Sequence, residues 1–244
     1  MWYFRKTDPL EITDQARFVS FVGAGGKSAL IEYLAAEELR RGKRVAITTT
    51  TKIWASEPYI LFDDLIGGVR PREEDYPEFL RVGKSVEEGK LTALEPKEIW
   101  ELSQHYDLIL IEADGAKGRP LKYPAEHEPV IPPFSDSVVV VTGLDALCMR
   151  VDQAVFRNEI FTEATGVPGD AELSEELFLA FFDPAIMLKD VDLEKCVIIL
   201  NKYDACQRRS PVTDMAKLVS RVADNAPVLI SSVKLGIFYG LKSV

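Results

Sequence analysis

The feature of this sequence that most constrains its fold is residues 18–34, FVSFVGAGGKSALIEYL. An apolar, β-prone run ends at Gly23, further glycines follow at once, and Lys27 opens a stretch with apolar residues at helical spacing. A strand, a glycine turn and a helix in this order are the context of a phosphate-binding loop. The start of the helix offers an anion unpaired N–H groups and the positive end of the helix dipole.

This loop is one glycine shorter than the usual pattern G-x-x-x-x-G-K-[ST], because Phe21 stands where the first glycine belongs. The remaining G-x-x-G-K-S keeps the end that carries the chemistry. Lys27 is expected to reach the β- and γ-phosphates, and the Ser28 hydroxyl to bind Mg²⁺. The alternative is a glycine-rich turn with an incidental lysine. The predicted phosphate-binding residues are Gly23, Ala24, Gly25, Gly26, Lys27 and Ser28.

Near-continuous apolar runs recur along the chain, with helical patterns between them. Such runs are typical of parallel strands that are buried on both faces. The sequence therefore predicts an α/β fold, a P-loop NTPase-like, mostly parallel sheet with helices on both faces, in three layers. We expect a single domain over 1–244, with an insertion at 53–104 and a helical segment at 153–190, where Ser174 caps a helix. The predicted strands lie at 18–22, 44–51, 106–115, 136–145, 195–204 and 226–234.

The net charge, the cysteines and the length of the apolar runs limit the partners and the location that we expect for this chain. A formal net charge of -10 disfavours non-specific binding to nucleic acid or to anionic membranes, so neither is expected as a partner. The three cysteines, Cys148, Cys196 and Cys206, form no C-x-x-C pair, and reduced thiols are expected. No apolar run reaches membrane-spanning length. These features predict a cytoplasmic protein.

Two carboxylates follow the run LILI at 108–111, where a parallel strand meets the ligand edge of the sheet. Glu112 and Asp114 lie two residues apart, so strand periodicity predicts that both point the same way and share a metal site with Ser28. The alternative is a pair of solvated charges. The predicted metal ligands are Ser28, Glu112 and Asp114, and the predicted catalytic residues are Lys27, Glu112 and Asp114.

A base-recognition motif follows the run CVIIL at 196–200. Asn201-Lys202-Tyr203-Asp204 is N-K-x-D, in which the aspartate accepts hydrogen bonds from N1–H and the N2 amino group of guanine. Adenine presents an acceptor at N1 and no group at position 2. Ser232, in the SSVK sequence after the last predicted strand, is expected near the base. The predicted base-binding residues are Asn201, Lys202, Asp204 and Ser232, and GTP is favoured over ATP.

Five stretches together resemble the YqeC family, the accessory proteins of selenium-dependent molybdenum hydroxylases. They are FVGAGGKSALI, VAITTTTKIW, LIEADGAKGRPLKYPAEHEPVIP, VVVVTGLDAL and FRNE. The resemblance implies a P-loop NTPase fold and a partner that is a molybdenum hydroxylase or its cofactor-maturation machinery. LILIEADG and NKYD are more distantly similar to the nickel-insertion GTPases, whose metal-binding cysteines and histidines are not found here.

Residues and resemblance together predict Mg²⁺-dependent binding and hydrolysis of GTP, or of ATP, in the service of hydroxylase maturation. Loop 48–52 or loop 114–127 is expected to respond to the γ-phosphate. One alternative is a small-molecule kinase that acts on a cofactor precursor, with lid residues drawn from Arg70, Arg72, Arg208 and Arg209. The other is a module that binds a nucleotide without cleaving it.

Overall fold

A ten-stranded sheet forms the centre of the molecule in the computed structural model, which describes residues 2–68, 79–209 and 211–243. Its strand order is β1-β15-β14-β13-β11-β2-β9-β3-β6-β5, and every pairing from β14 to β5 is parallel. The strands are β1 Trp2–Lys6, β2 Phe18–Gly23, β3 Val45–Thr49, β5 Tyr59–Leu61, β6 Leu80–Gly83, β9 Leu108–Glu112, β11 Ser137–Gly143, β13 Cys196–Asn201, β14 Val228–Ser232 and β15 Ile237–Ser243.

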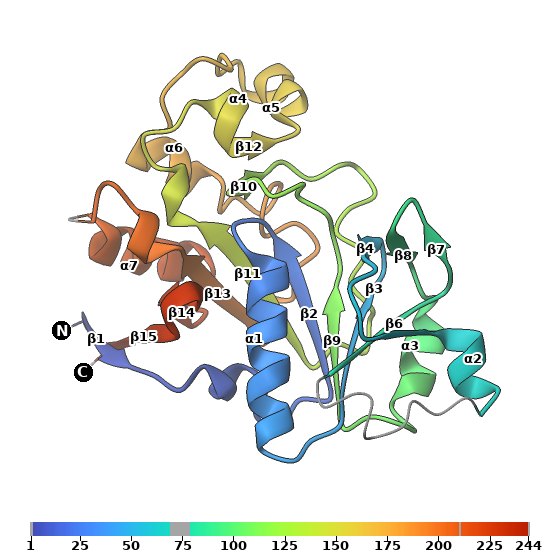
Figure 1. The fold of residues 1–244 in the computed structure, drawn as a ribbon. Coiled ribbons are helices and arrows are strands. Elements are labelled where there is room, and N and C mark those ends of the chain that lie inside the picture. Colours follow the sequence, from blue (N-terminus) through green and yellow to red (C-terminus); the bar gives the residue numbers. More distant parts are fainter. Residues whose placement is uncertain (1, 69–78, 210, 244) are drawn as a thin grey trace.

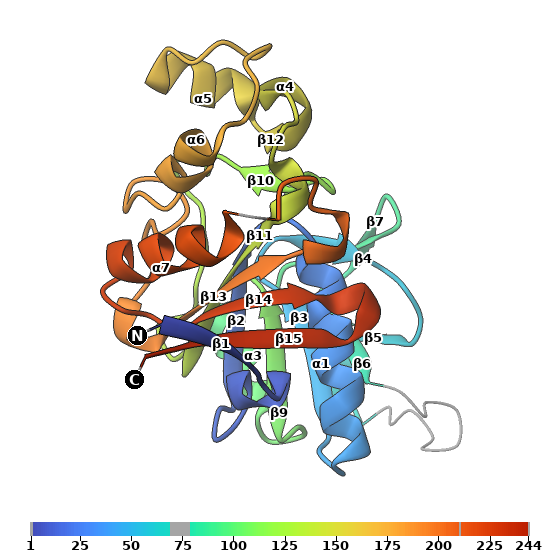
Figure 2. The same cartoon turned by 90° about the vertical axis from the view of Figure 1, so that its left-hand side faces the viewer.

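Helices cover both faces of this sheet, as Figures 1 and 2 show. Helix α1 packs on one face against β2, β9 and β3, while α7 and α6 lie on the other face with the residues of β11, β13 and β14. Helix α3 covers that second face below β9 and β3. The predicted three-layer α/β/α fold is confirmed. The α-helices are α1 Lys27–Arg40, α2 Phe62–Ile66, α3 Pro96–Leu102, α4 Val151–Ala154, α5 Asn158–Thr165, α6 Glu175–Ala180 and α7 Val212–Val222.

The strand residues alternate between the two faces, and both faces are apolar. In β2, Val19 and Phe21 pack with α1, whereas Val22 joins the cluster under α6 and α7. This double burial is why the strands are apolar almost without interruption. In the described ranges, the connections also contain the 3₁₀-helices η1 Pro9–Ile12, η2 Leu144–Ala146, η3 Leu193–Lys195, η4 Tyr203–Ala205 and η5 Val233–Leu235.

The stretch 53–104, expected as an insertion, contributes strands to the main sheet. β5 pairs with β6, and β6 pairs with β3, so this stretch extends the parallel sheet at its edge. A separate small sheet has the order β4-β8-β7, with β4 at Lys52–Trp54, β7 at Val86–Glu87 and β8 at Lys90–Thr92. Arg70 and Arg72, candidate lid residues of the kinase alternative, lie outside the described residues.

The stretch 153–190 contains the end of α4, then α5 and α6, joined by irregular turns. Strand β12 (Val155–Phe156) pairs in parallel with β10 (Leu121–Lys122), and α4, α5 and β12 project above the sheet in Figures 1 and 2. Ser174 is the N-cap of α6, and its Oγ accepts a hydrogen bond from Leu177 N at 3.2 Å. The predicted cap is confirmed.

The two terminal segments form an antiparallel edge that sequence patterns did not predict. β15 pairs with β14, and β1 pairs with β15, so the ends of the chain lie side by side (Figure 1). Within the described part of the chain, no helix is long and apolar enough to cross a membrane.

Candidate functional site

The candidate site lies where the strand order reverses. From β2 the chain runs through α1 to β3 and then to β9 on one side, and later passes to β11 on the other side of β2. Ligands of open α/β sheets bind at this switch point, at the carboxyl ends of the strands. The register brings the last residues of several strands to this edge, since Phe21 pairs with Glu112, Gly23 with Val141 and Asn201 with Gly143.

The glycine turn after β2 requires glycines. Gly23, Gly25 and Gly26 have φ of 92°, 74° and 107°, in the region that favours glycine. A Cβ on Gly25 would lie 2.6 Å from Gly143 Cα, so the turn packs directly on the backbone at the end of β11. Both the conformation and this close approach exclude larger side chains.

Some N–H groups of this turn are hydrogen-bonded within the protein, whereas those at the start of α1 have no partner within the helix. Ala24 N donates to Val141 O at 2.8 Å and Gly25 N donates to Arg119 O at 3.0 Å, so these amides hold the turn in place. Gly26 is the N-cap of α1 and makes no side-chain cap hydrogen bond. The first N–H groups of a helix have no partner within the helix. The α1 start is therefore the part of the loop with donors for an anion.

Lys27 is buried beside this turn, with 4% of its surface exposed. Its ammonium donates to Gly23 O at 2.7 Å and pairs with Asp114 Oδ1 at 2.6 Å. Burial alone would lower the pKa of Lys27, but Asp114 and then Glu112 outweigh it, and the pKa is raised. Lys27 is thus a fixed positive charge next to the helix start.

Ser28 and Glu112 face each other on the opposite side of the loop. Ser28 Oγ donates to Glu112 Oε2 at 2.9 Å. Removal from water raises the pKa of Glu112, opposed by the nearby Lys27 ammonium and the Ser28 hydroxyl. A hydroxyl and a carboxylate are ligands that suit Mg²⁺, which usually takes one or two protein oxygens together with phosphate and water. This pair fits such an ion.

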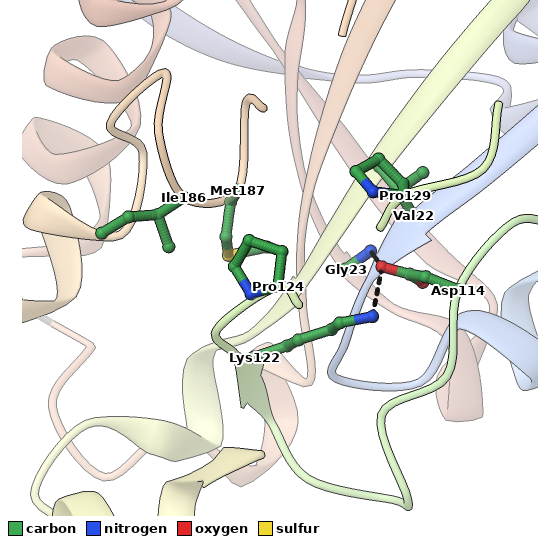
Figure 3. Close-up of a pocket in the computed structure, with 8 residues that line it drawn as sticks. All are labelled: Val22, Gly23, Asp114, Lys122, Pro124, Pro129, Ile186 and Met187. Atoms are coloured by element: carbon green, nitrogen blue, oxygen red, sulfur yellow. Dashed lines mark hydrogen bonds and ion pairs between the residues drawn. The ribbon is translucent and has the colours of Figure 1, made fainter. Parts of the chain in front are cut away.

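Asp114 has different partners from Glu112, because β9 ends at Glu112 and strand periodicity no longer applies. Asp114 Oδ2 accepts from Gly23 N at 2.9 Å and pairs with Lys122 at 3.0 Å (Figure 3). Asp114 Oδ1 pairs with Lys27. Both carboxylate oxygens are engaged within the protein. Its predicted role as a metal ligand stays a prediction, and the contacts observed are with two lysines and the loop.

An ion-pair network continues from Asp114 away from the loop. Lys122 Nζ lies 2.6 Å from Glu128 Oε2, and Glu128 is bound in turn by both terminal nitrogens of Arg157. Burial would raise the pKa of Glu128, but its bonds to Arg157 and Lys122 lower it to about 2. Signs alternate along this chain, so each buried charge has an opposite neighbour.

Glu128 and Arg157 are site neighbours that pattern analysis did not select. They lie far from the glycine loop in sequence, and no spacing rule links a lysine at 122 to an arginine at 157. The available signal was their presence in the stretches LKYPAEHEPVIP and FRNE. Across the described residues, no group of three or more His, Cys, Asp or Glu side chains is arranged to hold a metal ion.

The predicted base-binding residues gather around a second part of the site. A cavity of about 230 Å³ is lined by Asp204 and Ser232 together with Tyr203, Leu235 and Tyr239. Ser232 Oγ donates to Asp204 Oδ1 at 2.6 Å. Among residues 2–68, 79–209 and 211–243, no hydrogen bond to Asp204 Oδ2 is present.

Asn201 and Lys202 connect this cavity with the glycine turn. Asn201 Nδ2 donates to Gly25 O at 2.9 Å, and its Oδ1 accepts from Ser231 Oγ and Val233 N. Lys202 Nζ pairs with Asp145 Oδ2 at 2.8 Å. The Asn201 amide thus braces the glycine turn against the end of β14, and base recognition by Asp204 stays a prediction.

Of the arginines proposed as kinase lid residues, Arg208 and Arg209 lie among the described residues. Arg209 donates to Asp204 O at 2.9 Å and stacks over the Tyr203 ring, at the edge of the 230 Å³ cavity. Arg208 pairs loosely with Glu175, at 3.9 Å.

A Gly-Lys-Ser turn between a strand and a helix, at the switch point of a parallel three-layer sheet, defines a P-loop NTPase-like protein. The sequence model of the YqeC protein family matches residues 19–159. The uncharacterized protein YqeC of Escherichia coli (strain K12) is 34% identical over 198 residues, covering 78% of this chain and 77% of that protein. The chain belongs to the YqeC family.

Solved structures with detectable likeness are more distant. The hydrogenase maturation factor HypB from Archaeoglobus fulgidus is 15% identical, with a TM-score of 0.43, and the match covers 94% of this chain and 88% of that one. The signal recognition particle 54 kDa protein from Aeropyrum pernix K1, in complex with GDP, is 14% identical with a TM-score of 0.44, covering 96% of this chain and 46% of that one.

Proposed function

We propose that this protein binds a nucleoside triphosphate with Mg²⁺ and hydrolyses it. The observation that carries the proposal is the start of α1, where an uncapped helix end follows a turn of glycines with positive φ and lies beside the buried Lys27 ammonium. Helix N–H groups and a lysine together make an anion site that overcomes the negative charge of the whole chain. Lys27 reaches the terminal phosphates, for which it exchanges part of its contact with Asp114.

Magnesium fits this site through Ser28 and Glu112. Their oxygens, 2.9 Å apart, would hold the ion next to the helix start, with phosphate oxygens and water as its other ligands. The ion, when bound, neutralises charge on the phosphates. Glu112 holds one side of the metal, and Ser28 fixes the distance between the metal and the loop.

We propose GTP in preference to ATP. The 230 Å³ cavity has room for a base between Tyr203 and Leu235, with the Asp204 carboxylate at its edge. Since Ser232 uses only Oδ1, Oδ2 remains to accept from N1–H or N2 of guanine. Adenine would leave this charge without a donor, a loss of about 1.5–3 kcal/mol for a hydrogen bond to a charged group.

Isothermal titration calorimetry with GTP, ATP, GDP and ADP, with and without Mg²⁺, tests the proposal. We expect GTP to bind at least about tenfold more tightly than ATP, which corresponds to about 1.4 kcal/mol. Mg²⁺ should strengthen binding of GTP more than binding of GDP, because the ion bridges the terminal phosphates. A parallel assay of phosphate release measures hydrolysis. Absence of binding for all four nucleotides would refute the proposal.

We further propose that the protein acts in the cytoplasm, in the maturation of a selenium-dependent molybdenum hydroxylase. Support comes from the motifs it shares with the YqeC family, above all ADGAKGRPLK and HEPVIP, which build the ion-pair network beside the loop. The test is to purify such a hydroxylase from cells with and without this protein, and to measure its activity and its molybdenum and selenium content. Equal content and activity would contradict this role.

A further inference from the structure

A small cavity lies beside the glycine turn, on the side of Lys122. Its polar wall consists of Gly23, Asp114 and Lys122, and its apolar wall includes Pro124, Pro129 and Met187 (Figure 3). The volume is about 10 Å³, which is the room needed by about one water molecule. A carboxylate, an ammonium and a peptide group offer that molecule several hydrogen bonds.

The buried Lys122 side chain lines this cavity and can contact a molecule inside it. Only 2% of its surface is exposed, and its Nζ lies 3.0 Å from Asp114 Oδ2 and 2.6 Å from Glu128 Oε2. An ammonium has three N–H donors, and no hydrogen bond from Lys122 Nζ to the described residues is present, so this group can donate to a molecule in the cavity that Lys122 lines. Figure 3 shows the side chain extended toward Asp114 and Gly23.

Lys27 and Lys122 form ion pairs with different oxygens of the Asp114 carboxylate. Lys27 pairs with Asp114 Oδ1 and Lys122 pairs with Asp114 Oδ2, and Lys27 also contacts Gly23, which lines the cavity. Under the proposed function, Lys27 binds the terminal phosphate. That phosphate therefore lies next to Asp114, close to the cavity and to the second ammonium.

We propose that the cavity holds the water that attacks the terminal phosphate, an inference that rests on the proposed function. Lys122 then supplies a second positive charge for this reaction, in addition to that of Lys27. The water oxygen forms a bond to the terminal phosphorus. The bond from this phosphorus to the bridging oxygen breaks, and its electron pair leaves with the nucleoside diphosphate. The water protons end on the phosphate product and in solvent. Lys122 holds the water against Asp114 and offsets negative charge as the bond breaks.

The test compares two variants that remove one cation each from the same network. Lys122→Met removes the cation that lines the cavity. The charges that remain in the network are then balanced, with two acidic residues (Asp114 and Glu128) and two basic residues (Lys27 and Arg157). Arg157→Met removes the outer cation, which binds Glu128 and does not line the cavity. For both variants and the unmodified protein, single-turnover phosphate release is measured with saturating GTP and Mg²⁺, along with the dissociation constant for GTP and the melting temperature.

We expect Lys122→Met to lower the single-turnover rate at least about 100-fold, since a cation of this kind contributes about 10³–10⁵ in kcat elsewhere. Its GTP dissociation constant should change less than about fivefold, whereas a mere loss of packing would alter affinity and melting temperature. Arg157→Met should keep its rate within about threefold of the unmodified protein. Lys122→Gln, which keeps a donor without the charge, is measured in the same way and covers the case in which Lys122→Met does not fold.

Equal rates for the Lys122 variants and the unmodified protein would overturn the inference, as would an equal fall in Arg157→Met. Tight GTP binding without phosphate release by the unmodified protein would also overturn it, while leaving nucleotide binding in place. Absence of GTP and ATP binding would instead refute the proposed function on which it rests.

Discussion

At the scale of single residues, the candidate site depends on charges that are buried and paired. Lys27 is held between Gly23 O and Asp114, so its ammonium is fixed before any phosphate arrives. A preorganised charge of this kind loses little entropy when it binds an anion. Asp204 is the opposite case, because one of its carboxylate oxygens accepts a hydrogen bond from Ser232 and the residue lines a cavity.

Lys27→Ala should weaken GTP binding at least about 100-fold. The change removes the ammonium at the helix start, and hydrogen bonds to charged groups contribute about 1.5–3 kcal/mol each. Calorimetric titration checks this, with a thermal melt to show that the variant is folded. Lys43→Ala, in the turn after α1, is a matched control that should keep full affinity. Unchanged affinity in Lys27→Ala would argue against a phosphate site at this loop.

Asp204→Asn should change the base preference of the site from guanine to xanthine. The asparagine carbonyl still accepts from N1–H, but its amide donates, which suits the carbonyl of xanthine at position 2 and opposes the amino group of guanine. We expect GTP affinity to fall roughly 10–100-fold and xanthosine triphosphate affinity to rise. Competition binding with both nucleotides measures the exchange. A parallel loss for both would show that Asp204 supports the loop and not the base.

The Glu128 carboxylate predicts a pH dependence of stability. Its pKa is lowered from 4.5 to about 2 in the folded chain, so its contribution is fully present above about pH 4.5 and is lost as the pH falls toward 2. Urea unfolding between pH 2 and 6 should show the free energy of unfolding decreasing with acid over this window. Glu128→Gln should flatten that slope. An unchanged slope would mean that other carboxylates carry it.

At the scale of elements, the glycine turn is fixed from three sides. β11 accepts from Ala24 N, the Arg119 carbonyl accepts from Gly25 N, and Asn201 of β13 donates to Gly25 O. Thr49, the last residue of β3, donates from Oγ1 to Glu112 O of β9, and Thr50, just after β3, donates from Oγ1 to Val130 O in the loop that follows β10. Elements distant in sequence therefore hold the groups of the candidate site in one arrangement.

Gly25→Ala should destabilise the protein by about 3 kcal/mol or more. Its φ is 74°, and the new Cβ would lie 2.6 Å from Gly143 Cα, against backbone that cannot move aside. Gly42→Ala is a matched control, because its φ is 86° and its Cβ would meet open space. That control should lose only about 1–2 kcal/mol. Urea denaturation compares the two, and equal losses would show that close approach to β11 is unimportant.

At the scale of the whole molecule, both proposed binding regions lie along one edge of one sheet. The proposed phosphate and metal groups lie at the ends of β2 and β9, and the cavity proposed for the base lies at the ends of β13 and β14, with Asn201 between them. A nucleotide bound across these strands would connect the two halves of the fold.

GTP with Mg²⁺ should therefore raise the melting temperature of the entire chain. A ligand at 100 times its dissociation constant stabilises the folded state by about 2.7 kcal/mol, which for a chain of this size is a shift of roughly 5–10 °C. Differential scanning calorimetry measures this, and Lys27→Ala under the same conditions should shift by no more than about 2 °C, since the ligand is then at or below the variant's dissociation constant. Mg²⁺ alone should have little effect. The absence of a shift with GTP at this concentration would contradict binding across the sheet.

Local patterns were sufficient to predict the central strands of the main sheet and the glycine turn between β2 and α1. The apolar runs predicted β2, β9, β11, β13 and β14, because a strand buried on both faces is apolar throughout. The edge pair β1 and β15 was missed, because their partners are the two ends of the chain and no local pattern records such a pairing. The strands β5 and β6 were missed because they are short and lie among turns.

The sequence by itself determined the parallel α/β fold, the glycine turn and the residue types at the ends of the strands. Only the tertiary structure decided which of those side chains meet. Glu112 and Asp114 were predicted to share one metal site, yet Glu112 contacts Ser28 whereas Asp114 joins Lys27 and Lys122. The physical reason is that hydrophobic periodicity and backbone conformation are local properties. A buried ion pair depends instead on distances between residues that only the folded chain brings together.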